Sequence, residues 1–261
     1  MKLQAHIGKT KGSFKNKDNR TAKLLANWDV LRMTMESFIR QGRGVTLRAR
    51  NAYGILLMME TGIRVGNEAS AEGYVCDQKH HKDYGKEIQV YGLTTLRKEH
   101  TKLNNNNNIT LNFLGKKAVP QFLKTSNPVL IKYYDTITQQ SYTTWLGISY
   151  SDIYKFVKKS IGHKYKPKDI RTAAVNCLFL KKVDQIKLLK KVFLKKGDIG
   201  RAIKLVVNAT AEEIGHTPGV CKSAYLSKSL QTVIKEQMVK KYKSAKAKAK
   251  AKAKTKAKAK K

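Results

Sequence analysis

Residues 47–68 read LRARNAYGILLMMETGIRVGNE, and this stretch decides the fold. Its apolar residues recur at the i, i+3, i+4 and i+7 spacing of one helix face, and further apolar residues widen that face. The side chains concerned are Ala52, Ile55, Leu56, Leu57, Met58 and Met59. The pattern therefore predicts a deeply buried helix from about Leu47 to Glu60, which ends at Thr61-Gly62.

Helical periodicity extends to most of the remaining chain. Helices are expected over residues 21–41, from Ser151, from Pro167, and over about 182–194, 199–214 and 220–242. Short β-like runs lie at 88–96, 109–113 and 118–122, with turn-forming residues at 104–108 and 115–117. The sequence thus predicts a mainly α fold with a small antiparallel β-sheet, an α+β class.

The charge of the chain points to a polyanionic partner. Its 54 Lys and Arg residues outnumber 18 Asp and Glu residues, which gives a formal net charge of +36. The Ala-Lys tail from Ser244 to Lys261 supplies nine of these charges, so +27 remains on the rest of the chain. Because neutralising phosphates releases condensed counterions, double-stranded DNA is the expected partner.

Composition also suggests how the chain is divided. We expect a basic arm over residues 1–20, one folded domain over 21–243, and a disordered tail over 244–261. No stretch reaches the roughly 18 apolar residues of a membrane span, so we expect no membrane association. Three cysteines without a C-x-x-C pair suit a reducing compartment, and we expect a monomer inside the cell, associated with DNA.

Several catalytic classes lack their motifs. There is no G-x-x-x-x-G-K-[ST] loop and no carboxylate cluster for two-metal chemistry, so we expect no nucleotide cofactor. Residues 72–87 look irregular, and Cys76, His80 and His81 lack a fourth ligand, so we expect no metal. Any cleavage of DNA would then depend on cations and a side-chain nucleophile.

Five motifs occur in a characteristic order. They are Thr61-Gly62-Ile63-Arg64-Val65-Gly66-Asn67-Glu68, Gly92-Leu93-Thr94-Thr95-Leu96, Lys168-Asp169-Ile170-Arg171-Thr172, Gly215-His216-Thr217-Pro218, and Tyr225. In this order the chain resembles the type IB DNA topoisomerases, especially the small poxvirus-like and bacterial ones, over about Trp28 to Tyr242. The resemblance implies that this domain is a catalytic domain, which relaxes DNA through a 3′-phosphotyrosyl intermediate without ATP or metal.

The resemblance also assigns roles. It implies that Tyr225 is the nucleophile, that Arg64, Arg171 and His216 hold the scissile phosphate, and that Lys116 is the general acid. The chemistry suits these residue types, because a phenol with a pKa of about 10 needs nearby positive charge to attack a phosphodiester. Two arginines and a histidine can supply that charge, and an ammonium can protonate the leaving 5′ oxygen. Lys117, Lys98 and Lys102 are alternatives to Lys116.

Residues after Arg64 are expected to face the DNA. Asn67 and Ser70 can read base edges, Lys168 can contact phosphate, and Glu68 should repel it. The segment between Glu68 and Gly92 is longer than is usual in the family. In the family, a small N-terminal β domain closes over the DNA opposite the catalytic domain, and this sequence shows no counterpart of it. The chain is therefore expected to be either a catalytic domain alone or one whose basic arm replaces that β domain.

Two other functions compete. A tyrosine recombinase or integrase shares the fold and the Arg, Lys, Arg, His, Tyr set, but usually has His three residues before the second arginine, where this chain has Lys168. A non-catalytic basic DNA-binding protein would explain the charge alone. It gives no reason for a Gly-His-Thr-Pro turn nine residues before a tyrosine.

Overall fold

The computed structural model describes residues 16–66, 68–77, 79, 81–185, 196–240, 244 and 247. The first 15 residues of the expected arm lie outside these ranges, as do Asn67, residues 186–194 of the helix expected over about 182–194, and the tail apart from residues 244 and 247, both helical. The described residues are mostly helical with two small antiparallel sheets, which confirms the predicted fold class. Within this part, no helix combines the length and apolar character that a membrane span needs.

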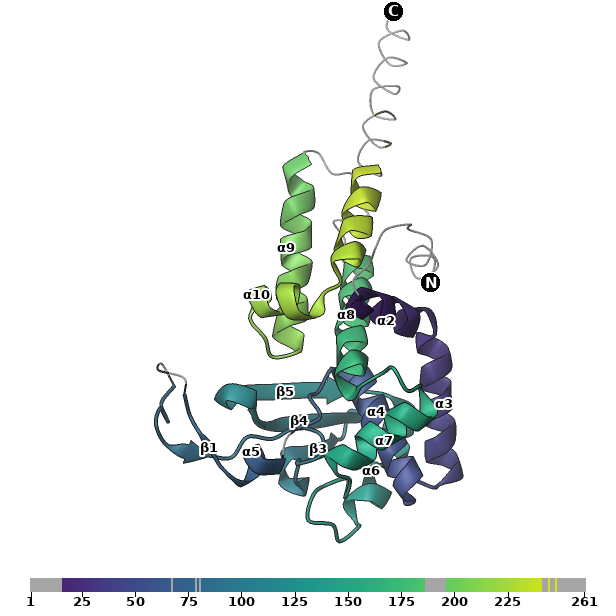
Figure 1. Cartoon of the computed structure of the whole chain (residues 1–261), viewed down its shortest axis with the longest axis vertical. Coiled ribbons are helices and arrows are strands. Elements are labelled where there is room, and N and C mark those ends of the chain that lie inside the picture. Colours follow the sequence, from purple (N-terminus) through teal and green to yellow (C-terminus); the bar gives the residue numbers. More distant parts are fainter. Residues whose placement is uncertain are drawn as a thin grey trace, which may run out of the picture.

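Helix α4 (Leu47–Thr61) is the centre of the core, as its sequence predicts. Thr46 caps it by accepting the Ala49 N–H, and nearly every one of its residues is buried. Four helices pack against it: α3 (Trp28–Gln41), α6 (Pro128–Thr138), α7 (Tyr150–Ser160) and α8 (Pro167–Gln185). Figure 1 shows α8 rising from this layer toward the C-terminal helices.

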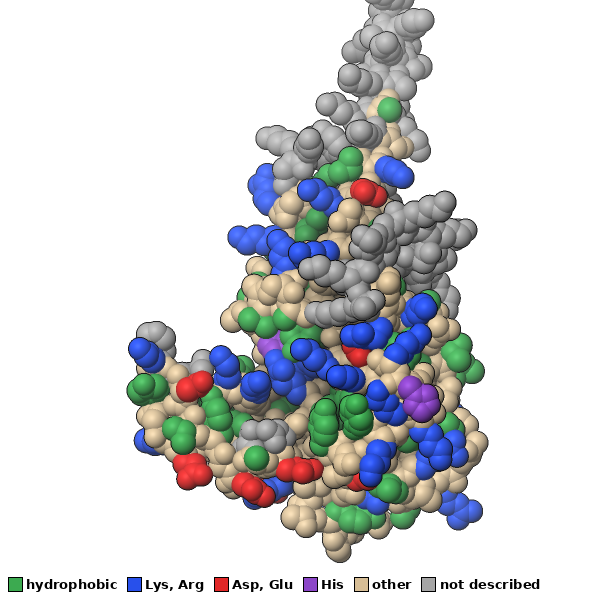
Figure 2. Space-filling view, in the orientation of Figure 1, with side chains coloured by type: hydrophobic (Ala, Val, Ile, Leu, Met, Phe, Trp, Pro, Cys, Tyr) green, Lys and Arg blue, Asp and Glu red, His purple; other side chains and the backbone are tan. Residues whose placement is uncertain are grey.

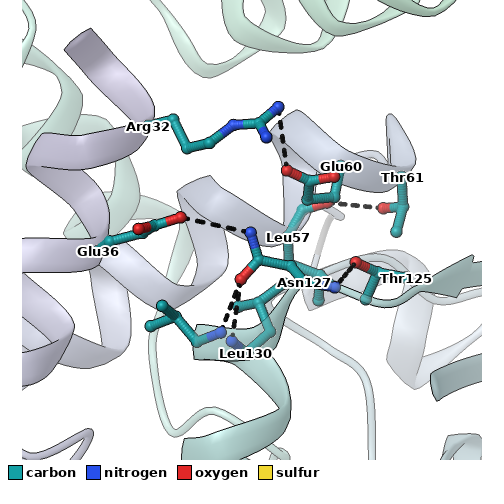
Figure 3. A network of polar contacts seen from close by, with 9 residues as sticks. Arg32, Glu36, Leu57, Glu60, Thr61, Thr125, Asn127 and Leu130 are labelled. Carbon is teal, nitrogen blue, oxygen red and sulfur yellow. Dashed lines mark hydrogen bonds and ion pairs between the residues drawn. The ribbon is translucent and has the colours of Figure 1, made fainter. Parts of the chain in front are cut away.

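Polar contacts also tie α3, α4 and α6 together (Figure 3). Arg32 of α3 lies 3.3 Å from the carboxylate of Glu60 in α4, and Asn127 lies 3.5 Å from Glu36 of α3. The Asn127 side chain also accepts the N–H groups of Val129 and Leu130, which caps α6. Helices α3, α4 and α6 therefore have a fixed mutual arrangement at the end of α4 that leads to Arg64.

The main sheet has the order β3-β4-β5, formed by Thr101–Asn104, Asn108–Gly115 and Val119–Thr125. The register pairs Leu103 with Ile109 and Leu111 with Leu123, which places alternate apolar residues in the core. The strands predicted at 109–113 and 118–122 are thus confirmed, and so are both turns. Strand β3 was not predicted.

The strand predicted over 88–96 is wrong. Only Glu87–Ile88 is a strand, β2, and it pairs with β1 (Tyr74–Val75) in a separate hairpin. Residues 92–96 form a turn, because their backbone binds the segment that follows α4 instead of a neighbouring strand. The region 72–87, expected to be irregular, therefore contains β1 and follows the short helix α5 (Glu68–Glu72).

The helix predicted over 21–41 is divided in two. Helix α2 (Asn16–Ala26) ends where Asn27 leaves helical geometry and its side chain donates to the Lys23 carbonyl, and α3 begins at Trp28. Residues 16–20 of the expected arm are therefore helical. Arg20 lies 3.3 Å from the Asp169 carboxylate, so α2 is attached to the start of α8.

The C-terminal part is likewise divided into more elements than the sequence predicted. Helix α9 (Lys196–Glu213) is followed by α10 (Pro218–Val220), a π-helical turn over Cys221–Tyr225, and a helix over residues 228–240. The helical region expected over about 220–242 is therefore helical where it is described, but residues 226–227 interrupt it. In Figure 1, α9 and the last helix stand side by side above β5, with α10 at their base.

Candidate active site

Two cavities lie side by side between the sheet and the C-terminal helices. One has a volume of about 610 Å³ and the other about 390 Å³. Four residues line both of them: Arg64, Tyr91, Lys116 and Lys117. His216 lines the larger cavity, and Arg171 and Tyr225 line the smaller one. The five residues expected to be catalytic, although distant in sequence, thus meet in one place.

Arg64 owes its position to the Thr-Gly break that ends α4. Gly62 has a φ of +66°, in the left-handed region that favours glycine, and its N–H donates to the Met58 carbonyl at 2.9 Å. The Thr61 hydroxyl donates to the Leu57 carbonyl and accepts the Ile63 N–H. The chain therefore leaves the helix in one defined direction, which carries Arg64 into the cavities.

The second motif holds the backbone of Arg64. Leu93 N–H donates to the Arg64 carbonyl at 2.8 Å, and Thr94 N–H donates to the Val65 carbonyl at 2.7 Å. A Cβ on Gly92 would lie 2.5 Å from the Cα of Gly66, so only glycine permits this approach. The residues predicted to be a strand thus serve to fix the arginine.

Arg171 lies near the start of α8 and is only 3% exposed. It donates to the Gly62 carbonyl, and its Nη2 lies 2.7 Å from Nε2 of His216. Its Nε is buried and has no hydrogen-bond partner among the described residues. Burial, with help from the neighbouring Arg64, lowers the pKa of Arg171 to about 10, so the side chain stays charged at neutral pH.

His216 follows a turn at the end of α9. Its backbone N–H donates to the Ala211 carbonyl, and Thr217 caps α10. Burial, together with Arg171 and Arg64, lowers the pKa of His216 to about 4. Because guanidinium groups only donate, Nε2 must be the unprotonated acceptor for Arg171. The prediction that His216 supplies positive charge is therefore wrong for the free protein, in which the ring is neutral at neutral pH.

The Tyr225 side chain lies among these groups. Its ring stacks on the His216 ring with centroids 5.1 Å apart and an interplanar angle of 19°. The guanidinium carbons of Arg171 and Arg64 lie 5.1 Å and 5.9 Å from the centroid of the Tyr225 ring. The side chain is 4% exposed and faces the smaller cavity. The hydroxyl is thus confined to a site with two cations.

Asn176 is a supporting residue that the sequence analysis missed. Its amide donates to the Tyr225 carbonyl at 2.9 Å, and its oxygen accepts the Ser227 N–H at 2.9 Å. Asn176 is fully buried in α8, one turn and a half beyond Arg171. A single side chain therefore links the helix of Arg171 to the backbone of the tyrosine. The signal was a polar residue on the apolar face of a predicted helix.

The turn between β4 and β5 presents the lysines. Lys116 and Lys117 are both exposed and line both cavities, whereas Lys98 and Lys102 line neither. Lys117 and Ala118 have φ values of +66° and +57°, which fixes a tight turn. Gln121 of β5, also missed from sequence, closes this side of the larger cavity and donates to the Gly215 carbonyl at 3.4 Å.

The expected DNA-reading residues are less fully defined. Asn67 lies outside the described residues, and Ser70 lies in α5. Lys168 is exposed and lines the smaller cavity. Glu68, expected to repel phosphate, accepts the N–H of Tyr150 at 3.2 Å, so it attaches α5 to the N-terminus of α7. Within the described ranges, no three His, Cys, Asp or Glu side chains could hold a metal ion; His80 lies outside them.

The α+β fold and the Tyr-Arg-Arg-His cluster define the class of domain that type IB topoisomerases and tyrosine recombinases share. The family model for the catalytic core of eukaryotic DNA topoisomerase I matches residues 9–254. The chain therefore belongs to the type IB topoisomerase family.

Poxvirus proteins are among its relatives. The DNA topoisomerase 1B of vaccinia virus (strain Copenhagen) is 28% identical over 160 residues, which cover 59% of this chain and 48% of that protein. The DNA topoisomerase 1 of rabbit fibroma virus is 27% identical over 184 residues, 68% of this chain and 52% of that protein. The chain spans about half the length of the curated relatives that it matches.

Proposed function

We propose that this chain relaxes supercoiled double-stranded DNA as a type IB topoisomerase. In this reaction Tyr225 cleaves one strand, the DNA rotates about the intact strand, and the break is resealed. One observation carries the proposal: the Tyr225 ring stacks on His216 with the guanidinium groups of Arg64 and Arg171 beside it. The proposal places the chain inside the cell on DNA, as a monomer without nucleotide or metal.

The two arginines suit the binding of the scissile phosphate. Both guanidinium groups lie near the same atom, Nε2 of His216, at 3.5 Å for Arg64 and 2.7 Å for Arg171. Donors that converge in this way can bind non-bridging oxygens and stabilise the charge that develops on them in the transition state. When the phosphate oxygens take over these donors, the neutral His216 no longer accepts from Arg171, so it can carry its proton on Nε2 and donate one hydrogen bond to the phosphate. Tyr225 then loses its phenol proton to water, attacks the phosphorus and forms the 3′-phosphotyrosyl bond.

Lys116 is proposed as the general acid. Its side chain is exposed at the border of both cavities, so it can reach the 5′ oxygen that leaves as Tyr225 attacks. The ammonium gives that oxygen a proton, and the 5′ hydroxyl departs. Resealing reverses these steps, because the phosphotyrosyl diester conserves the energy of the original bond. We further propose that Asn67, Ser70 and Lys168 contact the DNA around this site.

The test is relaxation of supercoiled plasmid in EDTA without ATP, followed by capture of a covalent adduct under denaturing conditions. We expect relaxation of both positive and negative supercoils. Tyr225→Phe should abolish the adduct while binding to DNA remains, because it removes the nucleophilic oxygen alone. A strict requirement for Mg²⁺ or ATP, or an undiminished adduct in the variant, would refute the proposal. Exchange of strands between two duplexes would favour the recombinase alternative.

A further inference from the structure

One side of α7 carries an aromatic and cationic stripe, in which Tyr150 is exposed and Tyr154 and Lys158 are half-buried. Tyr150, Tyr154 and Lys158 follow one another at intervals of four residues, beside the row of buried side chains that includes Ile153 and Val157. The two tyrosine rings are stacked with centroids 6.2 Å apart, and Lys158 Nζ lies 5.4 Å from the centroid of the Tyr154 ring. At 1.5 Å per residue the stripe is about 12 Å long.

The stripe begins at the candidate active site. Tyr150 lines the smaller cavity together with Tyr225, Arg171 and Lys168. Its backbone N–H is held by Glu68, and Ser149 and Asp152 form a capping box around the same helix end. The start of the stripe is therefore fixed relative to the segment that follows Arg64.

The surface around the stripe is strongly basic. Between residues 150 and 169 the chain has two carboxylates, and both are engaged: Asp152 caps α7, and Asp169 accepts the Lys166 N–H and pairs with Arg20. Six lysines lie in the same segment, namely Lys155, Lys158, Lys159, Lys164, Lys166 and Lys168. Figure 2 shows basic side chains over α7 and α8, whereas acidic ones gather below, over α5 and the β1–β2 hairpin.

We propose that duplex DNA on one side of the cleavage site runs along this stripe, and we call the stripe with its six lysines the α7 track. The inference rests on the proposed function and extends it to a flanking subsite. A length of about 12 Å corresponds to three or four base pairs at 3.4 Å each. The lysines neutralise phosphates of that segment, and the tyrosine hydroxyls donate to phosphate oxygens.

The stacking favours a duplex over a single strand. Single-stranded nucleic acid is bound by aromatic faces on which bases stack. In the α7 track, the rings of Tyr150 and Tyr154 stack on each other, and Lys158 lies against the Tyr154 ring. Their hydroxyl groups remain for contacts with a backbone. Exposed lysines beside them complete a surface for paired DNA.

The experiment compares affinity for duplexes of different flank length. Cleavage by the wild-type protein first maps a site, and binding is then measured in the Tyr225→Phe background with about one helical turn of DNA on each side. The track variant carries Lys155→Ala, Lys159→Ala and Lys166→Ala, three exposed positions. The matched control carries Lys23→Ala, Lys132→Ala and Lys235→Ala, exposed lysines of α2, α6 and the last helix.

On the long duplex, the track variant should bind at least about tenfold more weakly at 0.1 M salt. The slope of log affinity against log salt should correspond to about two to three fewer phosphate contacts than in the wild type. When one flank is trimmed to the cleavage site, this loss should disappear; trimming the other flank should leave it intact. The control variant should lose the same small amount on every duplex. The α7 track would be refuted if the affinity loss persisted whichever flank was shortened, or if the track variant lost no affinity for the long duplex.

Failure of the track differs from failure of the proposed function. If the wild-type protein forms no adduct at Tyr225 on any duplex, the proposed function fails. If the adduct forms normally but the track variant shows no dependence on flank length, only the track fails. Tyr154→Phe tests the hydroxyl contact separately, and it should weaken binding a few-fold on the long duplex and leave binding to the trimmed duplex unchanged.

Discussion

The cluster around Tyr225 and the lysines of the β4–β5 turn reach the same cavities, but the protein holds them in opposite ways. Arg171 and Tyr225 are 3% and 4% exposed, and the rings and guanidinium groups contact one another directly. Lys116 and Lys117 are exposed, and within the described part of the chain neither ammonium makes a hydrogen bond or an ion pair. The cluster around Tyr225 is therefore held in a fixed arrangement, whereas the lysine side chains of the turn are free to move.

This difference matches two chemical tasks. Stabilising charge on non-bridging oxygens requires donors at fixed positions, because a preorganised site costs no reorganisation during the reaction. Protonating a leaving oxygen requires a donor that can follow that atom as the bond breaks. The backbone of the lysine turn is fixed by its left-handed residues, while the side chains retain their freedom. Substitutions in the cluster should therefore reduce cleavage because donors leave their fixed positions. Substitutions in the turn should reduce it because the leaving oxygen loses its proton donor.

The largest expected effect separates the two groups by a chemical substitution in the DNA. Lys116→Ala should slow single-turnover cleavage by about 10²–10⁴-fold on ordinary DNA, the usual range for loss of a general acid. On DNA with a bridging 5′ sulfur the rate should be nearly normal, because a thiol with a pKa of about 8.5 leaves without a proton donor. Lys117→Ala is the matched control and should cleave ordinary DNA within a few-fold of wild type.

The assignment of the general acid to Lys116 would be wrong if the two lysine variants exchanged these outcomes. Rescue of Lys117→Ala by sulfur, with Lys116→Ala slowed equally on both substrates, would move the acid one residue along the turn. Rescue of Arg171→Ala by the same substrate would mean that the fixed cluster also acts on the leaving group.

A second substitution tests whether the cluster depends on geometry as well as charge. Arg171→Lys keeps the positive charge but loses the fork that reaches both the Gly62 carbonyl and His216. Adduct formation should fall by about 10²–10³-fold, the cost of removing one fixed donor to a developing oxyanion, with no rescue by sulfur. A rate within about threefold of wild type would show that charge alone is sufficient.

Apolar periodicity predicted the positions of several helices and strands, and the order of the motifs predicted which residues lie at the candidate site. Helix α4 and strand β4 have regular apolar spacing, and clear turn residues lie between β4 and β5, so their positions were predictable. The site was predictable because five short motifs appear in a fixed order. Two of the motif glycines now have a local reason: Gly62 before Arg64 is left-handed, and Gly92 closely approaches Gly66.

The missed features depend on contacts between distant segments. Residues 92–96 belong to a β-like run in the sequence, but their backbone binds Arg64 and Val65, 29 positions earlier in the chain. The neutral state of His216 follows first from burial, which lowers its pKa, and then from the proximity of two arginines, and no local pattern reveals either. Asn176 could not be assigned because its partner is the backbone near Tyr225, 49 positions away.

A third prediction concerns the support of the fixed cluster. Asn176→Ala removes three buried hydrogen bonds, one of them to the Thr172 carbonyl within α8, and leaves the Ser227 N–H and the Tyr225 carbonyl without that partner. Each group left unpaired in the core costs about 1–3 kcal/mol, so the free energy of unfolding should fall by at least that amount. Cleavage should slow as well, since Tyr225 loses its link to the helix of Arg171. Asn112→Ala, at an exposed position of β4, should change stability by less than about 0.5 kcal/mol.

The smallest effect is a dependence of stability on pH that belongs to the cluster alone. The pKa of His216 is about 4 in the folded protein, against about 6.5 in an unfolded chain. Between these values the unfolded state takes up a proton that the folded state does not, so the free energy of unfolding should decrease as the pH falls from about 6.5 to about 4. Because the ring is half-exposed, we expect about 1 kcal/mol after allowance for solvent screening. In His216→Gln this part of the decrease should vanish in urea titrations, whereas His163→Gln, at an exposed position, should keep the wild-type slope. Equal slopes in all three proteins would mean that the pKa of His216 is the same in the folded and the unfolded protein, so that burial and the two arginines do not keep the ring neutral between about pH 4 and 6.5.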